Sequence, residues 1–85
     1  MHYVYVLKSK VDGYLYIGCT DNLKKRVIEH NAGKTKSIKH RAPFGLMYYE
    51  AYINKTDARK REIELKKNSY QKEQLIKRIE NCLKK

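Results

Sequence analysis

Short apolar segments separated by polar turns occupy the first part of the chain. Residues 3–7 and 14–17 are β-branched or aromatic almost throughout, a composition that favours strands. Residues 8–13 between them contain the turn-forming pair Asp12-Gly13, so the two strands are predicted to form a hairpin. Residues 44–53 have the same apolar and aromatic character and predict a third strand.

Polar caps and apolar residues at helical spacing predict three helices. The first begins after a capping side chain at position 20, 21 or 22 and ends at Gly33, with Leu23 on its buried face. The second begins near residue 54 or 56 and is interrupted at residues 68–69. Ser69 can cap the last helix, in which an apolar stripe recurs at helical spacing: Leu75, Ile76, Ile79, Cys82 and Leu83.

The order ββαβαα predicts one α/β (α+β) domain over residues 1–85, with a three-stranded, mostly antiparallel sheet flanked by helices. No apolar stretch is long enough to cross a bilayer and the first residues do not resemble a signal peptide, so a cytoplasmic protein is expected. Cys19 and Cys82 are too far apart for a disulfide scaffold or a zinc motif. Both are expected to be free thiols, with Cys82 packed in a core.

Positive charge is the strongest compositional signal. Twenty lysines and arginines oppose nine acidic residues, which leaves a net charge of +11. A field of this sign attracts polyanions, because neutralised phosphates release their condensed counterions. Nucleic acid is therefore the expected partner, and a basic protein that is merely soluble or that binds anionic membranes is the alternative.

Tyrosines are unusually frequent, and strand alternation is predicted to gather four of the eight on one sheet face: Tyr3, Tyr5, Tyr14 and Tyr16. Strand propensity and packing explain such tyrosines without any chemistry. A catalytic tyrosine would need a nearby base or cation, because its ordinary pKa of about 10 keeps the phenol protonated at neutral pH.

Two residues of the first predicted helix can act on a phosphate. Arg26 and His30 lie four residues apart, so they are neighbours at the border of the buried face. An arginine there can bind a phosphate, and a histidine can exchange protons near neutral pH. A pair of solvated side chains is the ordinary alternative.

Glu62 falls on the helical face, shared with Ala58 and Leu65, that should dock on the sheet. A carboxylate that loses its water there needs a cation in exchange. A lysine or arginine of the protein can supply it, and so can Mg²⁺, which prefers oxygen ligands. Spacing alone leaves both possibilities open.

A basic segment follows the first helix. Residues 34–42 contain no acidic residue and four basic ones: Lys34, Lys36, Lys39 and Arg41. We expect a mobile loop that contacts the nucleic-acid backbone and positions a substrate without recognising its sequence. An ordinary solvated loop is the alternative.

Taken together, these residues resemble the GIY-YIG nuclease superfamily, and its small stand-alone bacterial members most closely. Tyr-Val-Tyr at residues 3–5 and Tyr-Ile-Gly at residues 16–18 are similar to the two signature tripeptides, with ten residues between them. The similarity continues through residues 16–31 and 58–67 and covers nearly the whole chain. It implies a Mg²⁺-dependent (or Mn²⁺-dependent) endonuclease that acts on DNA more readily than on RNA. The superfamily serves in excision repair, homing, restriction and junction cleavage.

The same resemblance implies a role for each of five residues. Tyr5 would be the general base or would orient the attacking water, and His30 would accept its proton. Tyr16 would hold the phosphate or a metal-bound water. Arg26 would stabilise the transition state, and Glu62 would bind the metal.

Two departures from the superfamily pattern keep other hypotheses open. Cys19 stands where some nucleases carry a lysine, whereas the tyrosine that begins the first tripeptide in place of glycine is a mild change, frequent in the small members. Many also carry an asparagine beyond the metal glutamate, for which Gln74 is the nearest counterpart. A nucleic-acid-binding adaptor with weak or lost cleavage is therefore the second hypothesis, and a basic protein-interaction module is the third.

Overall fold

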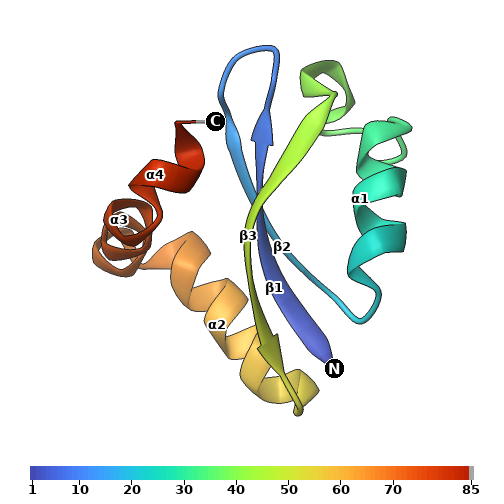
Figure 1. Ribbon diagram of the computed structural model, residues 1–85. Helices are drawn as coiled ribbons and strands as arrows, with labels where there is room; N and C mark the ends of the chain where they lie inside the picture. The colour runs from blue at the N-terminus through green and yellow to red at the C-terminus, as the bar shows by residue number, and fades with distance from the viewer. Residues whose placement is uncertain (85) are drawn as a thin grey trace.

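The computed structural model describes residues 1–84 and places one sheet between two layers of helices (Figure 1). The strands β1 (His2–Ser9), β2 (Leu15–Thr20) and β3 (Phe44–Tyr52) are antiparallel, in the order β2-β1-β3. Helix α1 (Leu23–Asn31) lies on one side of the sheet. Helices α2 (Lys55–Lys67), α3 (Ser69–Arg78) and α4 (Glu80–Leu83) lie on the other. The predicted fold class is confirmed.

The central strand β1 supplies side chains to two separate cores. Val4 and Val6 point toward α2 and α3, where they join the first core: Ile17, Ala58, Leu65, Leu75 and Ile79. Tyr5 and Leu7 point toward α1 and join the second, with Ile38 and Phe44. Because strand side chains alternate between faces, one strand holds both helical layers to the sheet. No helix within residues 1–84 is long and apolar enough to span a bilayer.

Asparagine side chains begin each of the three longer helices. The amide oxygen of Asn22 accepts from the backbone N–H of Lys25 at 3.1 Å, and that of Asn54 accepts from Thr56 at 2.8 Å. Such caps satisfy backbone donors that have no partner inside the helix, and each contributes about 1 kcal/mol. The predicted cap at Ser69 is wrong by one residue, because Asn68 caps α3.

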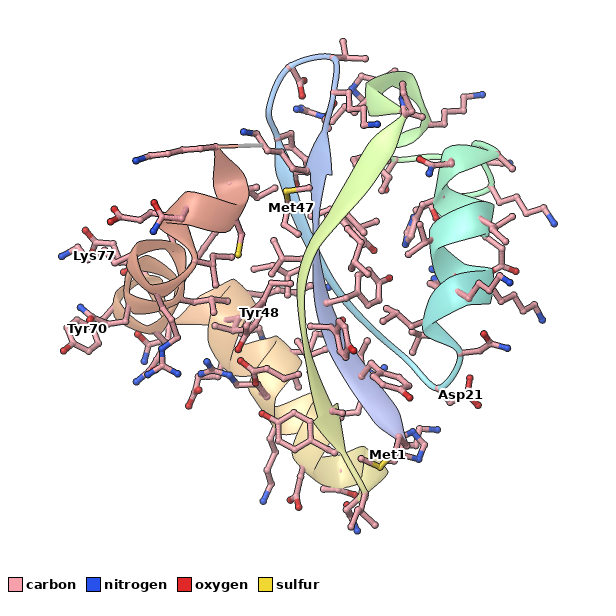
Figure 2. All side chains as sticks on the ribbon, viewed as in Figure 1. Met1, Asp21, Met47, Tyr48, Tyr70 and Lys77 are labelled. Atoms are coloured by element: carbon pink, nitrogen blue, oxygen red, sulfur yellow. The ribbon has the colours of Figure 1, made fainter. Side chains whose placement is uncertain are left out.

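The last predicted helix is not continuous. It stops at Arg78, and Ile79 leaves helical geometry before the short α4 resumes. The break rotates the final turn, so Cys82 is exposed and the expected core position for its thiol is wrong. The expected tyrosine face needs one correction, because Tyr14 precedes β2. Tyr48, which was not assigned to that face, packs on the opposite side of the sheet, toward α2 and α3 (Figure 2).

The connection from α1 to β3 is ordered by specific contacts. Gly33 turns the chain with a φ of 76°, a conformation that costs glycine little. The side chain of Asn31 accepts from the N–H of Phe44 at 2.6 Å and donates to its carbonyl oxygen at 3.2 Å. Ile38 is buried, and a 3₁₀ helix, η1, spans Lys39–Arg41. These contacts hold the end of α1 against the sheet, and the segment contains a buried residue and a 3₁₀ turn that the sequence did not predict.

Candidate active site

Tyr5 and His30 form a buried hydrogen-bonded pair at the centre of the molecule. The Tyr5 hydroxyl and His30 Nε2 lie 2.8 Å apart, and the two residues are 1% and 0% exposed. Burial raises the pKa of Tyr5 to about 12, and burial together with the Arg26 charge lowers the pKa of His30. Both groups are therefore neutral at neutral pH, and the imidazole is ready to accept a proton.

Thr35 completes this chain of hydrogen bonds. Its hydroxyl lies 3.0 Å from His30 Nδ1, on the far side of the ring from Tyr5. A neutral imidazole donates through one nitrogen and accepts through the other, so donation from Nδ1 to Thr35 leaves Nε2 free to accept from Tyr5. Sequence analysis missed Thr35 because its contact depends on how the chain folds back after Gly33.

Arg26 lies one helical turn before His30 and reaches the same phenol. Its guanidinium opposes the effect of burial by lowering the pKa of Tyr5, and contact with Tyr5 raises the pKa of Arg26. Nη1 also lies 3.3 Å from a carboxylate oxygen of Glu29, and the Arg26 side chain is 36% exposed. This arginine therefore contacts the buried phenol and solvent at the same time, as a phosphate-binding group would need to do.

Tyr16 lies beside the pair, on β2. Its ring centroid is 4.9 Å from that of His30 and 6.3 Å from that of Tyr5. From α2, Lys66 brings its ammonium to 5.7 Å from the Tyr16 ring centroid. Tyr16 thus connects the α1 side of the site to α2.

Glu62 reaches the same region from α2. One carboxylate oxygen accepts from Lys66 at 3.0 Å, and the other lies 3.9 Å from Arg59 Nε. The side chain is 12% exposed, and its charge contributes to raising the pKa of both Tyr5 and Cys19. Glu62 therefore shares Lys66 with Tyr16 and lies close enough to Tyr5 for its charge to act on the phenol.

Gly18 leaves room for the ring of Tyr5 on the neighbouring strand. It pairs with Tyr5 across the sheet on the edge strand β2, and the Tyr5 ring lies directly against it. A β-carbon at this position would lie 2.5 Å from Tyr5 Cζ, which no real side chain tolerates. Because glycine has no side chain, the Tyr5 ring can lie over the backbone of β2 while its hydroxyl reaches His30.

A cation-lined groove of about 690 Å³ adjoins this cluster. It lies where β1 begins, β2 ends and α1 and α2 begin, the end of the molecule marked by Asp21 in Figure 2. Basic side chains outnumber acidic ones among its lining residues: His2, Cys19, Thr20, Asp21, Asn22, Lys25, Arg26, Glu29, Lys55 and Arg59. The groove has the charge and position to hold a phosphate backbone beside Arg26.

Most of the basic segment of residues 34–42 lies beside the β1–β2 turn, at the end of the sheet opposite the cation-lined groove (Figure 1), although its Thr35 reaches His30. Lys34, Lys36 and Lys39 are exposed there. Arg41 is held by Asp12 at 2.7 Å, with its guanidinium 4.0 Å from the centre of the Tyr14 ring. None of these four side chains is among the residues that line the cation-lined groove. Their contact with nucleic acid stays a prediction.

Gln74, the nearest sequence counterpart of a supporting asparagine, also lies elsewhere. It lines a separate cavity of about 370 Å³ with Arg61 and Arg78. Cys19, in contrast, lines the cation-lined groove, where burial and the charge of Glu62 raise the pKa of its thiol. A neutral thiol there gives a phosphate no charged partner.

The donor atoms near Glu62 fit a weakly held hard cation. Within residues 1–84 no three acidic, histidine or cysteine side chains are grouped to bind a metal by themselves. Magnesium commonly binds through one or two carboxylates together with waters and substrate phosphate oxygens. Glu62 supplies one carboxylate, and its Oε1 has only a distant partner in Arg59. The residues present thus fit an ion that is completed by water and substrate.

Comparison with known proteins places the chain in a family. Residues 1–77 match the family model described as the GIY-YIG catalytic domain. A UPF0213 protein of Staphylococcus haemolyticus is 44% identical over 80 residues, which is 93% of this chain and 94% of that protein. A UPF0213 protein of Clostridium perfringens is 47% identical over 78 residues, or 89% and 83% of the two chains.

A solved structure agrees with this assignment. The solution NMR structure of a UPF0213 protein from Bacillus halodurans is similar, with a TM-score of 0.56 and 38% identity. The similarity covers 89% of this chain and 82% of that one. The signature tripeptides lie on β1 and β2, where Tyr5 and Gly18 are cross-strand partners. This protein therefore belongs to the GIY-YIG family.

Proposed function

We propose that this protein is a metal-dependent endonuclease that hydrolyses phosphodiesters in DNA, with Mg²⁺ or Mn²⁺ as the metal. Membership of the GIY-YIG family supports a nuclease-like role. The observation that carries the proposal is the convergence of the Tyr5–His30 pair, Arg26 and Glu62 beside a cation-lined groove. Repair or processing of DNA is the cellular role that best suits such an activity.

The proton transfers begin at the Tyr5–His30 pair. Water attacks phosphorus and gives its proton to the Tyr5 oxygen as Tyr5 passes its own proton to His30 Nε2. The bond from phosphorus to the leaving sugar oxygen breaks, and that oxygen takes a proton from solvent. Thr35 keeps Nδ1 protonated, so that the imidazole accepts at Nε2.

Access to Tyr5 sets a condition on this mechanism. The phenol is almost fully buried, and Arg26 both interacts with it and lines the cation-lined groove. Binding of a phosphate must therefore turn Arg26 away from the phenol and admit the attacking water. In that position the guanidinium neutralises the charge that develops on the phosphoryl oxygens.

Glu62 is the proposed metal ligand. A divalent ion bound there would act as a Lewis acid and stabilise negative charge on the reacting phosphate. Lys66 and Arg59 hold the carboxylate in place, and Lys66 also keeps its ammonium near the Tyr16 ring. Tyr16, beside the Tyr5–His30 pair, would donate its hydroxyl to the phosphate.

The test is a panel of single-stranded, duplex and branched DNA and RNA, with Mg²⁺, Mn²⁺ or EDTA. Glu62→Gln should abolish cleavage and leave most binding intact, because it removes a metal ligand and keeps the shape. Arg26→Ala should slow cleavage by about 100- to 1,000-fold, the usual effect of losing one transition-state donor. Glu73→Gln, an exposed change on α3, is the matched control and should cut normally. Undiminished cleavage by Glu62→Gln would end the assignment.

Two observations favour the adaptor hypothesis. Glu62 already has two cationic neighbours in Lys66 and Arg59, and Cys19 supplies no charge to the groove. An adaptor would bind nucleic acid in a salt-sensitive way that survives EDTA, and it would release no products from any substrate of the panel. Metal-dependent products that disappear in Glu62→Gln would exclude it.

A further inference from the structure

Tyr3 and Tyr49 form an aromatic pair on the sheet face that carries Tyr5. Their ring centroids are 5.8 Å apart and their planes meet at 72°, an edge-to-face arrangement. Tyr49 pairs with Tyr5 in the β1–β3 register, so both side chains project from the same face on neighbouring strands. The aromatic pair is therefore adjacent to the candidate active site.

This pair belongs to neither core of the protein. Tyr49 is 52% exposed and Tyr3 is half-buried, and neither side chain is among the residues packed in the two clusters. Figure 1 shows why: the beginning of β1 and the end of β3 extend past the first turn of α1. A large aromatic surface is thus left in solvent where α1 no longer covers the sheet.

The cation-lined groove begins beside Tyr3, the member of the pair on the central strand. Tyr3 pairs with Thr20 across β1 and β2, and both Thr20 and the preceding strand residue His2 line that groove. Lys25, Arg26, Lys55 and Arg59 supply its positive charge. A polynucleotide whose phosphates lie in the groove would therefore bring its bases next to Tyr3 and Tyr49.

We propose that Tyr3 and Tyr49 are a stacking platform for an unpaired base of a single-stranded nucleic acid, which makes single strands the preferred substrate. Bases stack well on tyrosine rings, and stacking accepts any base because each has a flat aromatic face. A base inside a duplex already has its faces covered by its neighbours, so it cannot use the platform. The inference rests on the proposed function only in treating the bound strand as the substrate.

Binding measured in EDTA tests the platform without any cleavage. The probe is a short oligothymidylate carrying one 2-aminopurine, whose fluorescence is quenched by stacking, and a blunt duplex of equal length is the comparison. Tyr49→Ala should weaken binding of the single strand by about 5- to 150-fold, the range for loss of one stacked base. It should also remove the quenching and leave duplex binding unchanged.

Two further variants separate stacking from general damage. Tyr49→Phe keeps the ring and should bind the single strand like the wild type. Tyr70→Ala removes another exposed tyrosine, on α3, and should have no effect. Equal weakening on both probes, a Tyr49→Phe variant as weak as Tyr49→Ala, or unchanged binding by Tyr49→Ala would overturn the inference.

The two proposals fail in different ways. If quenching depends on Tyr49 but no substrate is cleaved with Mg²⁺ or Mn²⁺, the platform stands and the nuclease proposal falls. If Glu62-dependent cleavage occurs but Tyr49→Ala quenches 2-aminopurine as the wild type does, the nuclease proposal stands and the stacking proposal is wrong.

Discussion

The ring of Tyr5 lies against the backbone of Gly18, and this close packing holds the phenol where its hydroxyl reaches His30. Gly18→Ala should force the ring aside, because a β-carbon would lie 2.5 Å from Cζ and 3.0 Å from Cε1. We expect a loss of about 1–3 kcal/mol in the free energy of unfolding, as for other overpacked sites, and a larger loss of cleavage. Urea unfolding and single-turnover cleavage measure the two effects.

Gly45→Ala is the matched control for this change. Gly45 is also a strand glycine, but its nearest neighbour would be the flexible end of Met47 at 3.0 Å. The variant should therefore retain cleavage. If Gly18→Ala behaved like Gly45→Ala, the close packing of Tyr5 would not matter to the site.

Replacement of Thr35 should change the tautomer of His30. Thr35→Val removes the hydroxyl 3.0 Å from Nδ1, and the ring should then carry its proton on Nε2, where it can no longer accept from Tyr5. Nitrogen NMR of the imidazole should detect the exchange of tautomer, together with a loss of cleavage of about 10-fold or more. Thr35→Ser should restore both, and an unchanged tautomer in Thr35→Val would contradict the assignment.

Acid should destabilise the protein through His30. Its pKa is lowered in the folded state by burial and by Arg26, whereas the unfolded chain has the ordinary value of about 6.5. Below that pH the unfolded state binds more protons, so the free energy of unfolding falls as the pH drops toward the folded pKa. The contribution is fully present above about pH 6.5.

Chemical denaturation across this pH range provides the measurement. His30→Gln should reduce the acid sensitivity, and His40→Gln, at an exposed position, should keep it. Cleavage should fall only at lower pH, as the pH approaches the lowered folded-state pKa of His30, because a protonated imidazole cannot accept from Tyr5. Identical acid profiles for the wild type and His30→Gln would show that another group is responsible.

A second prediction about stability concerns Glu50 and Arg61, which join β3 to α2. Arg61 Nε lies 3.0 Å and Nη2 lies 3.1 Å from the two carboxylate oxygens, and Tyr48 donates to the same carboxylate at 2.7 Å. Burial opposes the charge of Glu50, but these hydrogen bonds hold its pKa below the ordinary value. Arg61→Ala should leave a charge without its partner and cost about 3 kcal/mol.

Thermal and urea unfolding of Arg61→Ala and of the double variant Glu50→Gln/Arg61→Met test this account. The double variant should recover much of the loss, because it removes both charges and keeps the packing volume. A double variant no more stable than Arg61→Ala would mean that the packing of Arg61, and not its charge, is what stabilises α2.

The basic segment at the other end of the sheet separates into two kinds of residue. The triple variant Lys34→Gln/Lys36→Gln/Lys39→Gln should weaken binding to every sequence and lower the dependence of log K on log salt by about 2 to 3. Arg41→Gln should mainly reduce stability, because Arg41 is held by Asp12 and Tyr14. Salt titrations of binding by fluorescence anisotropy distinguish the two. An unchanged salt dependence in the triple variant would show that these lysines do not contact the nucleic-acid backbone.

Periodicity along the chain was sufficient to predict the strands, the helices and the helical face of Glu62. Those features depend on residues near one another in sequence, such as the Asn22 cap or the Ala58–Leu65 spacing. Thr35 and Gly18 could not be assigned their roles in this way, because each acts through a contact that exists only after the chain folds back. The exposure of Cys82 was missed because the backbone departs from helical geometry at Ile79, which changes the direction of the side chains in α4.

The alternation of β1 between two cores has a consequence for how this protein would lose activity on heating. One core fastens α1, with His30 and Arg26, and the other fastens α2, with Glu62. Partial opening on either side would disperse the reactive groups while the rest of the sheet persisted. Thermal inactivation should therefore track whichever helix detaches first, and amide hydrogen exchange in α1 and α2 should identify it.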